Sequence, residues 1–434
     1  MDLNQSTITF PEFLHHILQL PKDWISKNHA KNTPKIDDIV QSQQYKETVS
    51  KYTSGLGPIT QKSSCYHPFI ILVNYIMDQL VTDSTPETRI CFCSITPVLG
   101  DRNSNKKPDV AGVLYQNLEL PEECSVNNLM NIAPKHACWW TQLLFFFEFE
   151  VSSSMFITEH FSSFLYETKA FMVTVASLTS NLSMLHCASY AQDMMSYSGL
   201  RNHVLGALVI DGTVSLLYYD RSINVVSQPL EFLQYPHQFV AMLQALSNLS
   251  LLQLGYADSK VIKPSPLLDN PRHALNGLEL TLKCGTKLLL GNTLYHQLSL
   301  FGNGTQVVQA SYLSGGKTLC ADGIKPLVVK LSWPPTSRTS EHKIIEKARQ
   351  SANCPEHYWA MNHLPRVLEQ DEHKLQLLSP CLVVHLGSQY EEHVLRILLQ
   401  EELYPIPGWT ITVDLTQSIL SELIKCRHLH SVLC

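Results

Sequence analysis

Lys330 and Glu341 are the residues whose types and surroundings point most directly to chemistry. Lys330 ends an apolar run that begins at Leu327, within the segment KPLVVKLSWPP at 325–335, so its ammonium belongs to a buried-strand pattern. Glu341 lies in the segment RTSEHKIIEKARQSA at 338–352, directly after two natural helix N-caps. Because a buried carboxylate and a buried ammonium each need a partner, we expect these two side chains to pair.

The helix expected from about 340 to 351 decides where the Glu341 side chain points. Ile344, Ile345 and Ala348 form its apolar face. Glu341 precedes the two isoleucines by three and four residues, so it is expected on the same buried face. The alternative is that Glu341 only favours the helix N-terminus through the helix dipole, as first-turn glutamates commonly do.

Gly302, Asn303 and Gly304 lie at the end of an expected strand, and a valine-rich strand returns from them. A glycine-rich hairpin lets backbone N–H groups approach phosphate oxygens, because no Cβ stands in the way. Lys330, on the next strand, would add a positive charge near the same phosphates. The alternative is an ordinary Asn-Gly turn, which is common between paired strands.

A third group consists of Asp109, in KPDVAGVLY at 107–115, and Glu148, in FFFEFEVSS at 145–153. An aspartate at a strand start, followed by a strand carrying Glu-x-basic, is the layout of a restriction-endonuclease-like metal site. Glu150 stands where that layout has a lysine, which argues against nuclease chemistry. The alternative is a pair of structural or solvated acids at strand ends.

Composition limits the class of protein. The 434 residues are 44% hydrophobic and 16% charged, with a formal net charge of −6, which argues against a broad nucleic-acid-binding face. The twelve cysteines include no C-x-x-C pair, and no apolar run reaches the roughly 18 residues of a membrane span. The start MDLNQSTITFPEF lacks a signal-peptide pattern. We therefore expect an intracellular protein, cytoplasmic or nuclear, without a membrane span or a metal site.

The elements expected around the candidate residues mix helices and strands. They are a helix at 65–80, strands at 110–115 and 143–151, a helix at about 158–197, a hairpin turning at Asp211-Gly212, and a strand at 326–331. The predicted fold class is α+β. An N-terminal α/β domain at 1–260 is expected to precede a proline-containing linker at 261–277 and a second domain at 278–434.

The order of six segments resembles the fungal-type protein kinase family, which is expanded in mushroom-forming fungi. The segments are KPDV at 107–110, HVLGALVIDGTVSLLYYDRS at 203–222, FGNGT at 301–305, VVKLSW at 328–333, RTSE at 338–341 and LRILLQEELYPI at 395–406. The chain departs from the family pattern in two places. Ile223 replaces a glycine after the second segment, and Asn303 replaces a basic residue between the two glycines.

The resemblance implies a protein-kinase-like domain at the C-terminal end of the chain. Carried over position by position, Gly302 and Gly304 would cover the phosphates of ATP. Lys330 would contact the α- and β-phosphates, and Glu341 would pair with it. The segment from Glu401 to Leu403 would form the hinge that meets the adenine.

The resemblance also implies what an active kinase needs, namely an aspartate that accepts the substrate hydroxyl proton and an Asp and Asn that hold Mg²⁺. Neither His-Arg-Asp nor Asp-Phe-Gly occurs in this sequence. We therefore expect a truncated, incomplete kinase domain, consisting of the N-lobe, the hinge and the first C-lobe helix, that is inactive alone. Mg²⁺ and phosphorylation of protein Ser/Thr would belong to full-length relatives. The alternative is a non-catalytic pseudokinase or scaffold that binds protein partners and holds nucleotide weakly.

Overall fold

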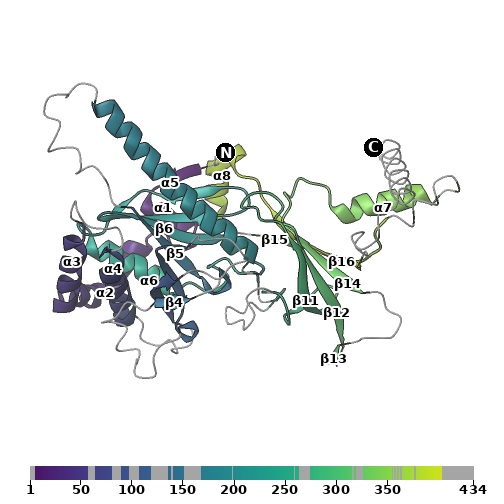
Figure 1. Ribbon diagram of the computed structural model, residues 1–434, viewed down its shortest axis with the longest axis horizontal. Helices are drawn as coiled ribbons and strands as arrows, with labels where there is room; N and C mark the ends of the chain where they lie inside the picture. The colour runs from purple at the N-terminus through teal and green to yellow at the C-terminus, as the bar shows by residue number, and fades with distance from the viewer. Residues whose placement is uncertain are drawn as a thin grey trace. The chain divides into compact units, whose positions relative to one another are not determined.

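The computed structural model describes residues 5–402, with gaps at 57–63, 81–88, 97–106, 119–134, 151–167, 263–273, 319–325 and a few shorter ones. The chain forms two compact units (Figure 1). Unit 1 contains Met1–Ala274, Gln297–Gly304 and Leu375–Glu392, and unit 2 contains Leu275–His296, Thr305–Lys374 and His393–Cys434. Two short segments from the second half of the chain therefore belong to unit 1. The division into domains at 261–277 stays a prediction.

Unit 1 is built on one mixed sheet. Its strands are β1 (Gln5–Ile8), β2 (Ile90–Thr96), β3 (Val110–Leu114), β4 (Lys135–Ala137), β5 (Phe145–Glu150), β6 (Val204–Ile210), β7 (Thr213–Tyr219), β8 (Asn224–Ser227) and β9 (Leu230–Glu231). The order is β1–β8–β7–β6–β5–β3–β2–β4, with β9 paired to β7. Strands β2, β3 and β5 form an antiparallel run, and β6 lies parallel to β5 after a helical crossover.

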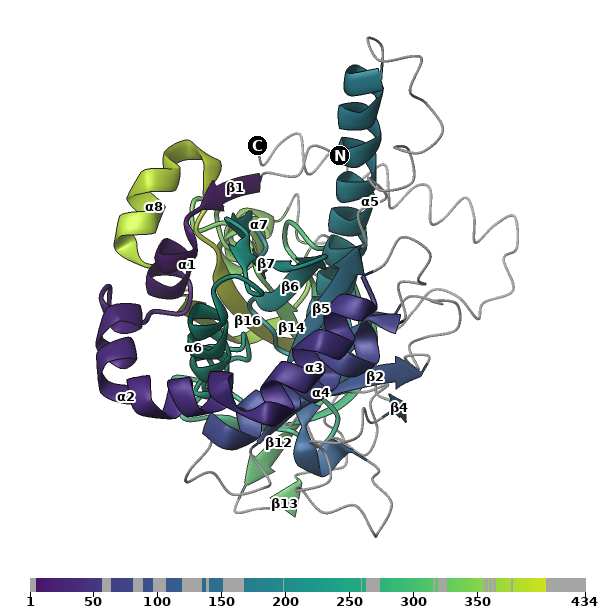
Figure 2. The same cartoon turned by 90° about the vertical axis from the view of Figure 1, so that its left-hand side faces the viewer.

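Helices cover both faces of this sheet. They are α1 (Phe10–His16), α2 (Trp24–Gln41), α3 (Gln43–Ser54), α4 (Tyr66–Leu80), α5 (Thr168–Tyr197), α6 (Pro236–Ser247) and α8 (Pro380–Leu386). Side chains of α1, α3, α4 and α6 form one buried cluster with one face of the sheet, while α5 packs on the other face (Figure 2). Unit 1 thus has three layers, with the sheet in the middle.

Strand β5 shows how the sequence produces this arrangement. Successive side chains of a strand point to opposite faces. Phe145, Phe147 and Phe149 therefore join the cluster with α4, and Phe146 joins the cluster with α5. Glu148 is two residues after Phe146, so it points to the same face of the sheet, the one that α5 covers.

Two local predictions are confirmed in unit 1. The apolar residues of the predicted helix at 65–80 are buried in α4. The hairpin between β6 and β7 turns at Asp211-Gly212, where Ile210 pairs with Thr213 and Asp211 has a φ of 50°. A positive φ in a two-residue loop matches the twist of the flanking strands.

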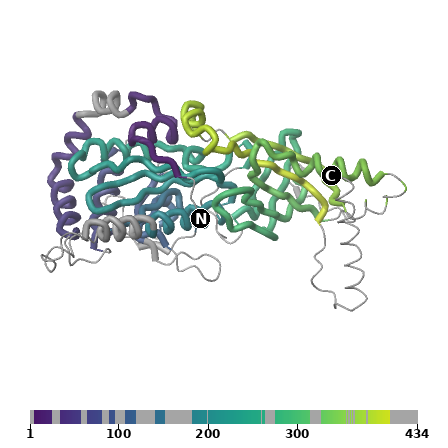
Figure 3. The backbone as a smooth tube through the Cα atoms, turned by 90° about the horizontal axis from the view of Figure 1, so that it is seen from above, coloured from purple at the N-terminus to yellow at the C-terminus, as the bar shows by residue number. Residues whose placement is uncertain are grey.

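The segment Leu375–Glu392 folds onto α1 (Figure 3). Ser379 caps α8, and its backbone N–H donates to the carbonyl oxygen of His16 at 3.1 Å. Leu378, Leu382 and Leu386 of this segment are buried in the same cluster as α1. Although the segment lies between two strands of unit 2 in the sequence, its apolar side chains are buried in unit 1.

The described residues of unit 2 form an antiparallel sheet and one helix. Its strands are β10 (Glu279–Thr281), β11 (Lys287–His296), β12 (Gln306–Ser314), β13 (Lys317–Thr318), β14 (Leu327–Ser332), β15 (Val367–Lys374) and β16 (Val394–Glu401), and its helix is α7 (Glu341–Ala352). The order is β10–β11–β12–β14–β16–β15, with β13 paired to β12. The predicted α+β class is therefore confirmed. Among the described residues, no helix is both long and apolar enough to span a bilayer.

Candidate functional site

Lys330 lies on β14, in the interior of the unit 2 sheet. It pairs with Val307 of β12 on one side and with Leu398 of β16 on the other. Its neighbours Val329 and Leu331 are fully buried, whereas the Lys330 side chain keeps 24% of its surface exposed. Because both neighbouring strands are hydrogen-bonded to β14, the backbone of Lys330 is held rigidly and its side chain leaves the sheet from a fixed point.

Glu341 is the first residue of α7. The helix begins at the N-cap Ser340, whose hydroxyl accepts a hydrogen bond from the backbone N–H of Lys343 at 3.4 Å. Glu341 Oε2 accepts a hydrogen bond from Lys330 Nζ at 2.6 Å. Strand β14 and helix α7 thus bring together the two residues that the sequence analysis pairs, in a charge-assisted hydrogen bond.

The surroundings of this pair differ from the expectation in one respect. Ile345 is buried, but Ile344 is 57% exposed, so the predicted apolar face of α7 is wrong at Ile344. The Glu341 side chain is itself 43% exposed. The pair is therefore open to solvent on one side, because only part of α7 is covered by the sheet. An ammonium has three N–H donors, and Glu341 takes one of them.

Gly302 and Gly304 belong to unit 1, where both contact Arg221. The backbone N–H of Gly302 donates to the carbonyl oxygen of Arg221 at 3.0 Å. A Cβ on Gly304 would lie 2.4 Å from Arg221 Cζ. The buried guanidinium donates in turn to the carbonyl oxygens of Ser299 and Met195. In this structure the two glycines serve a close backbone approach to Arg221, and their contact with ATP phosphates stays a prediction.

Arg221 is one of the residues that the sequence analysis did not single out. It follows Asp220, whose carboxylate accepts hydrogen bonds from Tyr218 Oη and from the backbone N–H groups of Ser222 and Ile223. Burial lowers the pKa of Arg221 to about 10, and Asp220 partly opposes this. The signal in the sequence was the segment Asp-Arg-Ser at 220–222 itself, which is one of the stretches that carries the resemblance.

The predicted hinge is described only in part. Glu401 is the last residue of β16, pairs with Leu327, and accepts a hydrogen bond from Arg366 Nη1 at 3.2 Å. Leu403 lies outside the described residues. The assignment of this segment to adenine binding therefore stays a prediction.

The acids of the nuclease-like layout lie on neighbouring strands of unit 1. Val110 of β3 pairs with Phe147 of the antiparallel strand β5. The next position along these strands therefore places Asp109 opposite Glu148. Asp109 Oδ1 accepts a hydrogen bond from Tyr66 Oη at 2.5 Å, and its Oδ2 accepts one from the backbone N–H of Phe149 at 2.9 Å. Protein donors thus satisfy both oxygens of Asp109.

Glu148 is buried under α5. Its carboxylate accepts a hydrogen bond from Tyr190 Oη at 3.2 Å and lies 3.4 Å from His186 Nδ1. Burial raises the pKa of Tyr190, and the Glu148 and Asp109 carboxylates raise it further, so the phenol remains a neutral donor. Among the described residues, no group of three or more His, Cys, Asp or Glu is placed to hold a metal ion.

Comparison with known proteins finds a match for the middle part of the chain. Residues 170–360 match the family model described as fungal protein kinase. The match includes β6 to β8, Gly302, Gly304, Lys330 and Glu341. No curated protein and no solved structure matches the chain. The order of segments predicted a resemblance to this family, and the match of residues 170–360 supports it: this part of the chain is similar to fungal protein kinases.

Proposed function

We propose that unit 2 is the nucleotide-binding part of a kinase-like domain, in which Lys330 contacts the α- and β-phosphates of ATP. The observation that carries this proposal is the 2.6 Å hydrogen bond between Lys330 Nζ and Glu341 Oε2. A lysine on a central strand, held by a glutamate from the following helix, is the arrangement that protein kinases use to place a positive charge on these phosphates.

The energetics of the pair support a functional role over a stabilising one. Ion pairs as exposed as this one contribute from nothing to about 1 kcal/mol to stability. A lysine in the middle of a sheet, by contrast, takes the place of an apolar side chain whose burial would have stabilised the fold. The placement is therefore better explained by an anionic ligand that uses the remaining donors of the ammonium.

Bound ATP would supply the phosphoryl group, together with Mg²⁺ held by its phosphate oxygens. The 434 residues contain neither His-Arg-Asp nor Asp-Phe-Gly. We therefore limit the proposal for these residues to nucleotide binding without phosphotransfer, as a pseudokinase would show. Phosphorylation of protein Ser/Thr is what the similarity to the family suggests for full-length relatives.

Thermal unfolding with ATP, ADP, and ATP with Mg²⁺ tests the proposal. The wild type should be stabilised by nucleotide, and Lys330→Ala should lose the shift. The matched control is Lys287→Ala, because Lys287 also forms an ion pair in unit 2, at 2.7 Å to Glu279 on strand β10. Loss of the ion pair alone should leave the nucleotide shift unchanged in this control. No shift for the wild type, or the same shift for Lys330→Ala, would contradict nucleotide binding at Lys330.

A further inference from the structure

A polar cavity of about 440 Å³ lies in unit 2, at the N-terminal end of α7. Its walls come from the turn between β10 and β11, the loop from Thr336 to Ser340, the first turn of α7, and strands β15 and β16. Every described residue in the lining is polar. Four cationic side chains, Lys283, Arg338, Lys343 and Arg396, face two acidic ones. The cavity is thus basic on a chain whose net charge is −6.

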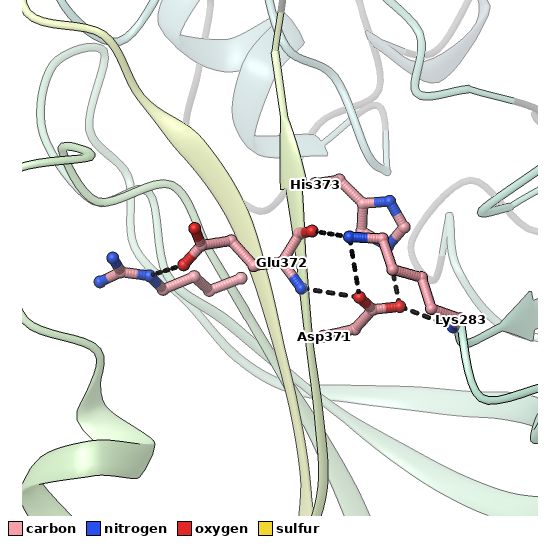
Figure 4. Close-up of polar contacts among 5 residues, drawn as sticks. Lys283, Asp371, Glu372 and His373 are labelled. Atoms are coloured by element: carbon pink, nitrogen blue, oxygen red, sulfur yellow. Dashed lines mark hydrogen bonds and ion pairs between the residues drawn. The ribbon is translucent and has the colours of Figure 1, made fainter.

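The first of the two acids, Asp371, is neutralised by the protein (Figure 4). Its side chain is only 4% exposed and lies 3.3 Å from Lys283 Nζ. It accepts hydrogen bonds from the backbone N–H groups of Lys283 and Glu372, both at 2.8 Å, and contacts His373 Nε2 at 3.1 Å. Burial would raise the pKa of Asp371, but these donors outweigh it and lower the pKa. Asp371 is therefore ionised and fully engaged in holding the wall together.

The second acid, Glu372, is paired with Arg396. Arg396 Nε donates to Glu372 Oε2 at 2.7 Å, and Arg396 Nη2 donates to the carbonyl oxygen of Arg338 at 2.7 Å. The same guanidinium therefore neutralises the acid and fixes the backbone of the loop that carries Arg338. Both acidic side chains of the cavity are balanced by cations within its own walls.

Lys343 stands in a position that the fold itself does not favour. It is exposed, and it lies in the first turn of α7, where the helix dipole disfavours a positive charge. Glu341, which could compensate in the same turn, is directed at Lys330. A bound anion would offset both the lysine and the helix N-terminus. The exposed hydroxyls of Thr336 and Thr339 in the adjoining loop offer further donors.

We propose that this cavity binds the phosphoryl group of a phosphorylated serine or threonine in a peptide. A phosphomonoester carries close to two negative charges and three acceptor oxygens, which matches a rigid wall of lysine, arginine and hydroxyl donors. Among its described residues, the lining offers no aromatic or aliphatic side chain to a nucleotide base or an acyl chain. Its polar groups fit a phosphorylated side chain and the peptide backbone around it. The proposal does not depend on nucleotide binding, because Lys330 is not part of the lining.

Fluorescence anisotropy with a labelled peptide pool tests the proposal. The pool carries one fixed phosphoserine between randomised residues, and an unphosphorylated pool serves as reference. Lys343→Glu should weaken binding of the phosphorylated pool by about tenfold or more, since a charge-assisted hydrogen bond is replaced by repulsion. The matched control is Lys347→Glu, which makes the same charge change on an exposed residue of α7 outside the cavity. It should weaken binding clearly less than Lys343→Glu, because Lys347 lies one turn further along α7 and does not line the cavity.

Three results would overturn the proposal. The first is equal binding of both pools, and the second is an equal loss in Lys343→Glu and Lys347→Glu, which would indicate only general charge attraction. The third is binding to vesicles that contain phosphorylated inositol lipids with no binding of the peptide pool, which would assign the cavity to lipid headgroups. Inorganic phosphate should compete with the phosphorylated pool. Lys330→Ala should retain peptide binding, so failure of the nucleotide proposal would be recognised separately.

Discussion

Arg221 occupies the space that a side chain on residue 304 would need. The Cζ of its guanidinium lies 2.4 Å from the position of a Cβ on Gly304, and Nε and Nη1 lie 2.8 Å from it. Arg221 is 3% exposed and its guanidinium donates to two backbone carbonyl oxygens. Parts of two segments that carry the family resemblance, Asp-Arg-Ser at 220–222 and Phe-Gly-Asn-Gly at 301–304, therefore meet inside unit 1.

The first prediction concerns this contact. Gly304→Ala should destabilise the protein by about 2–4 kcal/mol, because φ at Gly304 is +52° and the added methyl would have to displace a buried guanidinium. Urea unfolding followed by circular dichroism measures the loss. The control is Gly302→Ala, where φ is +90° but no atom lies within 4 Å of the new Cβ. That variant should lose only about 1–2 kcal/mol through backbone strain. Equal losses for both would show that the contact with Arg221 contributes nothing.

The second prediction separates stability from ligand binding at Glu341. Glu341→Gln should change the free energy of unfolding by less than about 1 kcal/mol, because the carboxylate is partly exposed and its ion pair is screened by solvent. The same variant should weaken the thermal shift caused by ATP, since the Lys330 ammonium would lose the charge that holds it. A large loss of stability with an unchanged ATP shift would assign the pair a structural role instead.

The third prediction concerns His203, whose Nε2 lies 2.9 Å from the carbonyl oxygen of Gln253. Burial lowers the pKa of His203 to about 4, and nearby Arg201 lowers it as well, while the hydrogen bond to Gln253 opposes them. The unfolded state binds a proton near pH 6.5, whereas the folded state does so only near pH 4. The contribution of His203 is therefore fully present above about pH 6.5 and declines as the pH falls toward 4, by a total of about 3 kcal/mol.

Urea unfolding at several pH values between 4 and 7 checks this dependence. His203→Gln keeps a donor for the Gln253 carbonyl but cannot titrate, so its stability should fall less over this range than that of the wild type. His67→Gln is the control, because His67 is exposed on α4, and it should follow the wild type. If the free energy of unfolding of His203→Gln depends on pH as steeply as that of the wild type, the acid sensitivity belongs to other groups.

The fourth prediction distinguishes a structural role of Asp109 from the nuclease-like alternative. Tyr66→Phe removes the hydroxyl that donates to Asp109 at 2.5 Å and should cost about 1–3 kcal/mol, because a partly buried carboxylate loses a donor. The control is Tyr75→Phe, whose hydroxyl donates to Ser42 Oγ at 2.8 Å in the same unit and lies away from Asp109. Thermal unfolding with and without Mg²⁺ or Mn²⁺ tests the alternative. Stabilisation by the metal that disappears in Asp109→Asn, with metal-dependent cleavage of DNA or RNA, would support a nuclease site.

The sequence by itself determined the features that depend on neighbouring residues. The alternation of phenylalanines in β5, the Asp211-Gly212 turn and the Ser340 cap follow from local periodicity and local hydrogen bonding. The strand carrying Lys330 and the helix beginning at Glu341 are also close in the sequence, so their ion pair could be predicted. The order of the six segments was enough to predict the family resemblance, because such an order is more specific than any single motif.

Only the tertiary structure decided which distant residues meet and which faces are covered. Ile344 has the spacing of a core residue but is exposed, because the sheet covers a narrower stripe of α7 than the pattern of apolar residues suggests. Arg221 meets Gly304, and Tyr66 meets Asp109, across long stretches of chain. Local patterns report interactions within a few residues along the chain. Contacts between residues that are distant in the sequence depend on how strands are ordered in a sheet and on where connecting segments return. The free energy of packing the whole unit determines both.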